Sequence, residues 1–373
     1  MDIPFSLPVI LTSALISQGI FAAILLFFQR NNSLANRYLA FLLLAFSLWL
    51  IDSFFRVSTI YEQNANYYFL PIYYSLAFGP LVYFYTQALT KGKRSLSARN
   101  LGHFIPVILL LGLYVFLQSQ SYEFRRDFWF EVHRPFTFRV EFILTFFSLG
   151  IYLVASMRVL KKYQAYIRNA FSEISRINLY WLRLVLGVMI FLSITWLLDA
   201  LLREVWVYYP KQNFSSIAIG ISLLVLAGGA LLQSPLKELG FNSEDRDTQL
   251  PKSSQQDLDP LLLERIQWEM KERKYYLNPR LTLESFAREL KEPSRLISQH
   301  INQGLGVSFI DFVNQFRVEA VKQRMESEDR QTLTLLGMAL ESGFNSKSTF
   351  NRIFKKFTGK SPSAYMKRSQ NKN

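Results

Sequence analysis

Two groups of polar side chains near the C-terminus have the residue types that read base edges in duplex DNA. The first group is Arg295, Ser298 and Gln299, and the second is Lys347, Ser348, Asn351 and Arg352. Arg and Lys bond to guanine, Gln and Asn to adenine, and Ser to either. Residues three or four positions apart share one face of a helix. The spacing therefore predicts two helices, each with a hydrogen-bonding face.

Other polar side chains in the same region are suited to contact phosphate groups. They are Asn302, Lys355, Lys356 and Lys360. Residues 259–330 contain 12 Lys or Arg and 12 Asp or Glu, whereas residues 331–373 contain 8 and 1. Cations that neutralise phosphates supply sequence-independent affinity. We therefore expect the second group to hold the DNA backbone, and the first, through Arg295 and Gln299, to select the sequence.

Each reading helix is predicted to be the second helix of a helix-turn-helix unit. Thr282 can cap the first helix of the first unit, whose apolar residues follow at helical spacing. The turns and close contacts are assigned to Ala287, Gly306, Ala339 and Gly343. We expect Gly343 at a positive φ, which glycine adopts readily. A helix over 308–325 is predicted to join the units as a rigid spacer, holding the two readers about one duplex turn apart.

Two such units at this spacing resemble the DNA-binding domain of the AraC/XylS transcription regulators. The similarity extends over residues 262–368 and is densest from Gly343 to Ala364, in GFNSKSTFNRIFKKFTGKSPSA. It implies a double helix-turn-helix whose second helices enter the major groove, with base contacts from the seven reading residues. Ile301 stands where the family often has Phe, and Met366 where it often has Arg, which removes one phosphate contact.

Many family members carry a cupin-like sugar-binding domain before the DNA-binding domain. In this chain, the sequence before residue 233 is instead typical of membrane-spanning helices. Seven stretches are apolar around the full helix and near the roughly 20 residues that a bilayer requires. They are 7–28, 38–55, 68–89, 101–117, 140–157, 180–202 and 214–232. Pro71, Pro80 and Pro106 could break helices there or be ordinary membrane-helix prolines. The chain is thus similar to a membrane-embedded bacterial branch of the family.

The predicted fold is all-α: a seven-helix transmembrane bundle followed by an all-helical double helix-turn-helix domain. We assign residues 1–232 to the membrane domain, 233–260 to a polar flexible linker and 261–373 to the DNA-binding domain. With the N-terminus outside, the cytoplasmic loops hold 11 Lys or Arg and the outer segments 7. This bias predicts a multi-pass protein of the bacterial cytoplasmic membrane, with its C-terminal domain beside the DNA.

Three carboxylates lie toward the predicted outer side of the spans: Asp52, Glu141 and Asp199. Charged side chains in such positions usually lie at the membrane interface or snorkel toward it. The alternative hypothesis is that these three line a cavity for a small molecule or an envelope signal of unknown identity. The loop from Gln118 to Phe138 is aromatic. The favoured interpretation is that its side chains form an aromatic belt at the membrane interface, and the second is that they form a lid over a ligand.

The composition excludes several classes of chemistry. There is no Cys, and the three His, at 103, 133 and 300, have unrelated spacing. We therefore expect no enzyme, no metal and no cofactor. The partners expected are double-stranded DNA, the lipid bilayer and the unknown signal, with a homodimer left open. The alternatives are a transporter whose fused DNA-binding domain controls its own expression, a membrane anchor that only holds DNA, and a regulator released by proteolysis in the linker.

Overall fold

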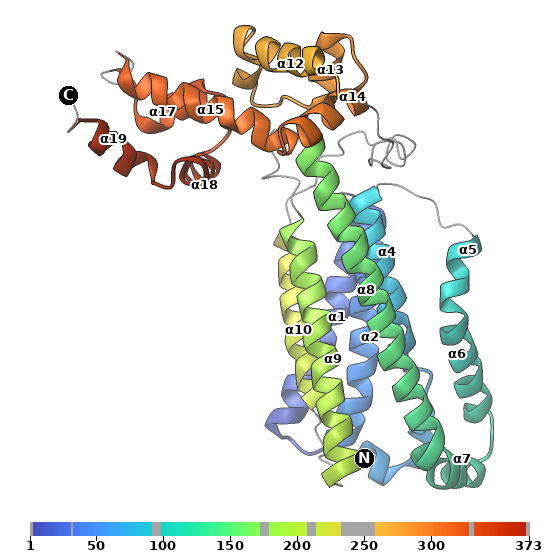
Figure 1. Ribbon diagram of the computed structural model, residues 1–373. Coiled ribbons are helices and arrows are strands. Elements are labelled where there is room, and N and C mark those ends of the chain that lie inside the picture. The colour runs from blue at the N-terminus through green and yellow to red at the C-terminus, as the bar shows by residue number, and fades with distance from the viewer. Residues whose placement is uncertain are drawn as a thin grey trace. The chain divides into compact units, whose positions relative to one another are not determined.

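A computed structural model shows a chain built from helices, with no strand among the residues it describes (Figure 1). These residues are 3–30, 33–91, 98–171, 179–206, 214–232, 258–327 and 332–370. The chain divides into two compact units, the first Met1–Lys161 with Leu179–Phe241 and the second Lys162–Asn178 with Asn242–Asn373. The predicted linker lies outside the described residues up to residue 257.

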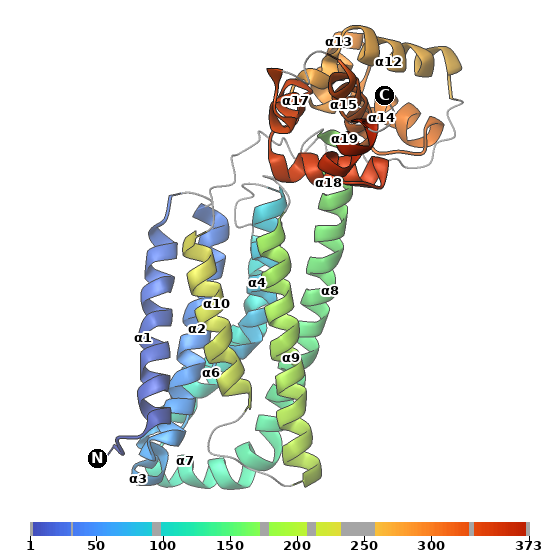
Figure 2. The same cartoon turned by 90° about the vertical axis from the view of Figure 1, so that its left-hand side faces the viewer.

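The first unit is a bundle of long apolar helices that run side by side (Figures 1 and 2). Its α-helices are α1 Leu7–Phe28, α2 Ser33–Val57, α3 Ile60–Gln63, α4 Phe78–Lys91, α5 Ala98–Leu101, α6 Ile105–Gln118, α7 Tyr122–Phe128, α8 Phe138–Ala170, α9 Tyr180–Trp206 and α10 Phe214–Leu232. The last residues of α8, from Lys162 on, belong to the second unit. Short 3₁₀ turns are η1 Ala65–Tyr67, η2 Ser75–Ala77 and η3 Gly102–Phe104, and η4 Trp129–Thr137 is a π-helix. Helix α1 packs against α2 and α10, and α10 also packs against α9.

Small residues allow these helices to approach closely. A Cβ added to Gly19 of α1 would lie 2.2 Å from the Ser47 hydroxyl of α2 and 2.5 Å from Leu223 of α10. Gly229 of α10 makes room for the Trp181 ring of α9. The indole of Trp181 in turn donates a hydrogen bond of 2.7 Å to the buried Tyr85 hydroxyl of α4. Close contact at small residues is how helices associate where lipid removes the hydrophobic driving force.

Four helical stretches are long and apolar enough to cross a membrane, by length and composition. They are Leu7–Phe28, Leu34–Val57, Tyr122–Ala170 and Tyr180–Val205. Gly102–Gln118 and Phe214–Ala230 are apolar but shorter. The outward faces of the four long stretches carry large hydrophobic side chains such as Phe21, Phe147 and Ile194. Six of the seven predicted stretches thus coincide with apolar helices, and the count of seven spans stays a prediction.

The third predicted apolar stretch, residues 68–89, is not one continuous helix. Phe69 has a left-handed backbone with φ of 61°, and the chain turns through Pro71 before α4 begins at Phe78. Proline lacks the N–H that a helix interior needs, and it disfavours a helical conformation in the residue before it. Pro80 causes no break because it lies in the first turn of α4, where its N–H would have no intrahelical partner.

The second unit contains the helices predicted for a double helix-turn-helix. They are α12 Pro260–Glu272, α13 Leu283–Leu290, α14 Ser294–Gln299, α15 Phe309–Glu326, α17 Leu335–Glu341, α18 Lys347–Thr358 and α19 Pro362–Gln370, with a 3₁₀ turn η5 Tyr275–Leu277 and a π-helical turn η6 His300–Gly304. Thr282 caps α13 in a reciprocal pair of hydrogen bonds with Ser285, which satisfies N–H groups that the helix leaves open.

Two apolar cores hold this unit together, and α15 contributes to both. Phe309, Phe312 and Val313 join the first core with residues of α12, α13 and α14. About two to three turns further on, Val321 and Met325 join the second core with residues of α17 and α18. The predicted spacer helix is therefore shared between the two helix-turn-helix units.

Candidate functional site

Helix α14 presents the first predicted reading group. It begins after Lys291, whose φ of 58° turns the chain, and it buries Ile297 against the first core, as η6 does with Ile301. On the other face Arg295 is exposed, and Ser298 and Gln299 are half-buried. The periodicity of α14 therefore gives the exposed face that the sequence predicts.

Side-chain hydrogen bonds already connect part of this group. The amide of Asn302 donates to the Ser298 hydroxyl at 3.1 Å, and the Gln299 amide donates to Gln303 at 3.3 Å. Asn302 lies in the π-helical turn η6, which continues α14 as far as Gly304. A base or phosphate would have to compete with these exposed or partly exposed contacts, whereas Arg295 projects into solvent.

Helix α18 presents the second reading group. The hydroxyl of Ser346 accepts a hydrogen bond from the Thr349 N–H and caps the helix. Phe350, Ile353 and Phe354 are buried in the second core. The four predicted reading residues are all exposed: Lys347, Ser348, Asn351 and Arg352.

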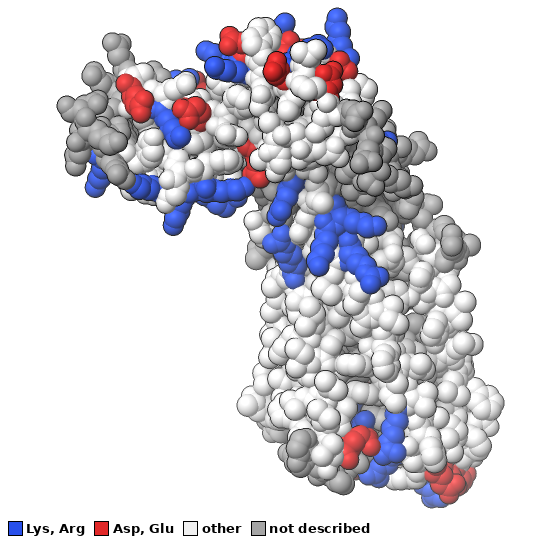
Figure 3. All heavy atoms as spheres, viewed as in Figure 1, with Lys and Arg blue, Asp and Glu red and all other residues white. Residues whose placement is uncertain are grey.

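The predicted phosphate cations of α18 differ in their surroundings. Lys355 is exposed, and Lys360 is partly exposed just beyond the helix. Lys356 forms an ion pair of 2.5 Å with Asp311 of α15 and lies over the Phe357 ring. Lys and Arg side chains gather over α18, whereas both signs of charge are interleaved over α12 and α13 (Figure 3). On this face of the unit, the positive surface therefore lies mainly over α18.

A buried arginine ties the two helix-turn-helix units together. Arg317 of α15 is fully buried, and it donates hydrogen bonds of 2.8 Å to the carbonyl oxygens of Tyr276 and Asn278. The turn of the second unit lies against the same segment, because the Asn345 amide donates to the Pro279 carbonyl at 3.0 Å. Burial also raises the pKa of the Tyr276 phenol above its usual value, so the ring stays neutral.

The turn of the second unit requires glycine at residue 343. Gly343 has a φ of 88°, which confirms the positive value expected from the sequence. A Cβ there would lie 2.3 Å from the Tyr276 carbonyl oxygen and 3.0 Å from the Arg317 guanidinium. Gly306, at the end of the first unit, also has a positive φ, of 69°, but open space surrounds it.

Comparison with known proteins places a family of domains in this part of the chain and finds relatives of limited coverage. Residues 286–368 match a family model described as a helix-turn-helix domain. An uncharacterized HTH-type transcriptional regulator of Staphylococcus aureus is 36% identical over 69 residues, which are 18% of this chain and 9% of that protein. The ornithine utilization regulator of Pseudomonas aeruginosa is 36% identical over 83 residues, 22% of this chain and 23% of its own. The C-terminal region is an AraC-type helix-turn-helix domain.

The likeness to these relatives covers only part of each chain. The chain spans less than a quarter of the length of either relative. No solved structure matches the chain. Within the helix-turn-helix domain, the two small residues assigned to close contacts, Ala287 and Ala339, are both buried.

Sequence reasoning missed Arg317, although a signal for it exists. It lies four residues after Val313 and four before Val321, so the apolar stripe of α15 runs straight through it. A charged residue on a buried stripe needs polar partners, since an uncompensated buried charge is costly. The carbonyls that supply them lie about 40 residues earlier in the chain, and no local pattern points to them.

The three carboxylates predicted to line a cavity have different surroundings. Asp52 of α2 is buried, forms an ion pair with Arg56 and accepts a 2.8 Å hydrogen bond from Tyr61. Glu141 of α8 accepts one of 2.8 Å from Tyr114. Asp199 of α9 accepts hydrogen bonds from the Phe214 N–H and from the Ser215 N–H and hydroxyl, so it caps α10.

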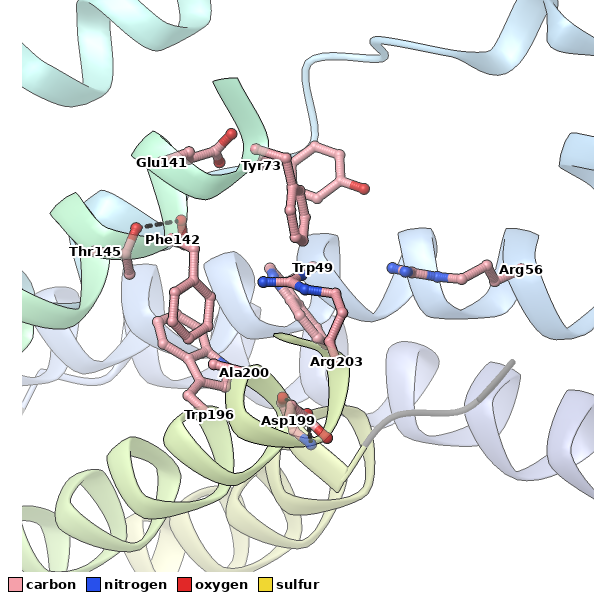
Figure 4. Close-up of a pocket in the computed structure, with 13 residues that line it drawn as sticks. Trp49, Arg56, Tyr73, Glu141, Phe142, Thr145, Trp196, Asp199, Ala200 and Arg203 are labelled. Carbon is pink, nitrogen blue, oxygen red and sulfur yellow. Dashed lines mark hydrogen bonds between the residues drawn. The ribbon is translucent and has the colours of Figure 1, made fainter. Parts of the chain in front are cut away.

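The structure brings Glu141 and Asp199 to one cavity of about 70 Å3 within the bundle (Figure 4). Asp52 is not in its lining, but its partner Arg56 is. The cavity lies where α2 and α9 end and α8 and α10 begin, with Trp49, Trp196 and Arg203 also in its wall. The two arginines were not singled out from the sequence, because only the packing of distant helices brings them to one site.

Proposed function

We propose that the chain is a membrane-bound, sequence-specific DNA-binding transcription regulator in which a signal sensed by the apolar bundle controls the helix-turn-helix domain. The observation that carries this proposal is the presence, in one chain, of an AraC-type helix-turn-helix domain and of helices apolar enough to cross a membrane. A regulator that must sense the envelope while reading DNA needs both parts.

The exposed side chains of α14 and α18 support the assignment of base reading. Arg295, Lys347 and Arg352 project from helices whose opposite faces are buried. In helix-turn-helix proteins, the second helix of the motif lies in the major groove, where such side chains reach base edges. Lys355 and Lys360 would then bind the phosphates beside the groove.

The charge distribution along the bundle supports the membrane assignment. The middle of the bundle surface is free of Lys, Arg, Asp and Glu over the described face, and charges gather near its ends (Figure 3). At one end, Arg158, Lys161 and Lys162 are exposed on α8. We propose that this end faces the cytoplasm, in accord with the excess of positive charge in cytoplasmic loops.

The proposed switch carries out no chemical reaction. The signal would bind two states of the bundle with different affinity, since a ligand with equal affinity for both states shifts neither. The DNA-bound fraction of the helix-turn-helix domain would follow that equilibrium.

The test is genome-wide recovery of DNA crosslinked to the full-length protein in isolated membranes. An Arg295→Ala/Lys347→Ala variant is compared with Lys271→Ala/Lys322→Ala, which removes the same charge from α12 and α15. Discrete sites that the first variant loses and the second keeps would support the proposal. Sites bound only by a soluble fragment would show release by proteolysis, and the lack of discrete sites would refute a DNA-reading function.

A further inference from the structure

The polar groups that line the cavity in the bundle differ in how many hydrogen bonds they already form. Its two carboxylates are already engaged. Asp199 receives three hydrogen bonds from the start of α10, and Glu141 receives one from Tyr114. A carboxylate used to cap a helix is held by the helix's own N–H groups and has little capacity left for a ligand. Asp199 therefore has mainly a structural role, whereas Glu141 accepts one hydrogen bond and retains acceptor sites.

Its two arginines, by contrast, retain donors. Arg56 donates through one terminal amino group to Asp52, and its Nε is buried with no hydrogen-bond partner among the described residues. Arg203 donates through Nε to Glu204 at 3.1 Å, while its terminal amino groups bond to no residue that the structure describes. A guanidinium has five N–H donors in a fixed plane, so each arginine can donate hydrogen bonds to an oxyanion and keep its present partner.

The position of Arg203 is fixed by packing. Its guanidinium lies 4.6 Å from the centre of the Phe138 ring and 5.6 Å from that of Phe142, and its side chain is 20% exposed. Arg139 donates to both oxygens of Glu204, at 3.2 Å through Nε and at 3.0 Å through a terminal amino group, and the first of these oxygens also accepts the hydrogen bond from Arg203. One carboxylate shared by two arginines leaves Arg203 incompletely neutralised.

The walls around the arginines are aromatic. Trp49 and Trp196 line the cavity together with Phe142 and Arg203 (Figure 4). A space of about 70 Å3 has room for a group of a few heavy atoms, since a single water needs about 10 to 15 Å3 on this measure. Ligand sites in proteins commonly combine apolar walls with a few polar groups in this way.

We propose that this cavity binds a small oxyanion, a carboxylate or phosphate group, through Arg203 and Arg56, with any apolar part of the ligand against Trp49 and Trp196. This inference rests on the proposed function, because it names the chemical class of the signal that the bundle senses. The oxyanion can come from a small acid in solution or from the headgroup of an anionic lipid, and both present the same chemistry to the arginines.

The test measures binding at the cavity of the full-length protein. Hydrogen–deuterium exchange of peptides within 138–145 and 196–203 is followed in uncharged detergent micelles, during titration with sodium phosphate or sodium benzoate against sodium chloride of equal ionic strength. Peptides of α18 are followed separately, since phosphate can also bind its lysines. A second arm compares nanodiscs of phosphatidylglycerol with nanodiscs of phosphatidylcholine.

The variants separate the anion site from the ion pair beside it. Arg203→Gln removes the cavity donor, and Arg139→Gln removes the other partner of Glu204 without changing the cavity wall. We expect the apparent Kd to rise about tenfold or more in Arg203→Gln, because hydrogen bonds to charged groups are worth about that factor, and less than about twofold in Arg139→Gln. Ala200→Phe fills the cavity without changing charge and should also abolish protection, which keeps the test decisive if Arg203→Gln folds poorly.

Protection by phosphate or benzoate that depends on Arg203 supports a soluble ligand. Protection only in phosphatidylglycerol discs, with the same dependence, supports a headgroup. The proposal is overturned if neither arm protects these peptides, or if Arg203→Gln and Ala200→Phe respond like the unaltered protein. Since this readout contains no DNA, its failure leaves the DNA-reading assignment intact, and loss of chromosomal sites would leave the anion site intact.

Discussion

The two helix-turn-helix units share an architecture and differ in how their reading helices are equipped. Helix α14 has six residues, and its polar side chains are partly engaged with their neighbours on α14 and η6. Helix α18 has 12 residues, its four reading residues are exposed, and cations gather over it. The first unit is thus suited to selecting a sequence and the second to holding the duplex. The units also differ at their glycine turns, and that difference offers the strongest test.

Gly343→Ala should have the largest effect, because the new Cβ would overlap the Tyr276 carbonyl oxygen at a left-handed position. We expect the free energy of unfolding of the helix-turn-helix domain to fall by about 3–4 kcal/mol, from backbone strain and overlap together. Gly306→Ala is the matched control in the first unit, with open space around its Cβ, and should cost about 1 kcal/mol. Urea unfolding of the full-length protein, followed by hydrogen exchange of α13 to α18, measures both. Equal losses would show that the close contact at Gly343 is not important.

Arg317→Met should rank next, since it removes the donors that join the two units while keeping the side chain's length. The Tyr276 carbonyl would lose its partner, and we expect a loss of about 2–3 kcal/mol in unfolding free energy. The same exchange experiment should show lower protection in both units. Gln323→Met, at an exposed position of α15, is the control and should change stability by less than about 0.5 kcal/mol. A loss confined to one unit would argue against Arg317 as the link.

Much of this domain could be predicted from the sequence because its signals are local. The cap at Thr282 and the positive φ of Gly343 depend on residues within a few positions of each other, and the structure confirms both. Long-range partners were not predictable. Arg317 bonds to carbonyls 39 and 41 residues away, and the arginines of the bundle cavity meet only through the packing of α2 and α9. The third apolar stretch was misread because hydropathy does not register the turn at Phe69.

Arg295→Ala tests the selective role of the first unit. A good contact to one base is worth about 1–3 kcal/mol of discrimination, so we expect the preference to relax at one position of the binding site. Selection from a library of random duplexes, with the full-length protein in micelles, measures the preference. Arg288→Ala on α13 removes an exposed charge outside the reading helix and should leave it unchanged. Equal weakening on every sequence would mean that Arg295 contacts only phosphate.

Lys355→Glu tests the holding role of the second unit and should have the smallest effect on sequence preference. It should weaken binding to all sequences by about 1 kcal/mol and lower the salt dependence by about one counterion. Lys356→Glu should do less, because Lys356 already pairs with Asp311. Lys271→Glu on α12 is the control of equal charge change. The comparison between the units fails if the salt dependence of binding is the same for all three variants.

Helix α15 contributes side chains to two different cores, with Val313 in the first and Val321 in the second. If either core unfolds, α15 loses packing contacts that also keep this helix in place against the other core. The two units should therefore melt in a single transition, and a fragment cut after residue 327 should lose order in α14 as well as the missing second unit. We therefore expect damage to one of the helices α14 and α18 to lower the order of both.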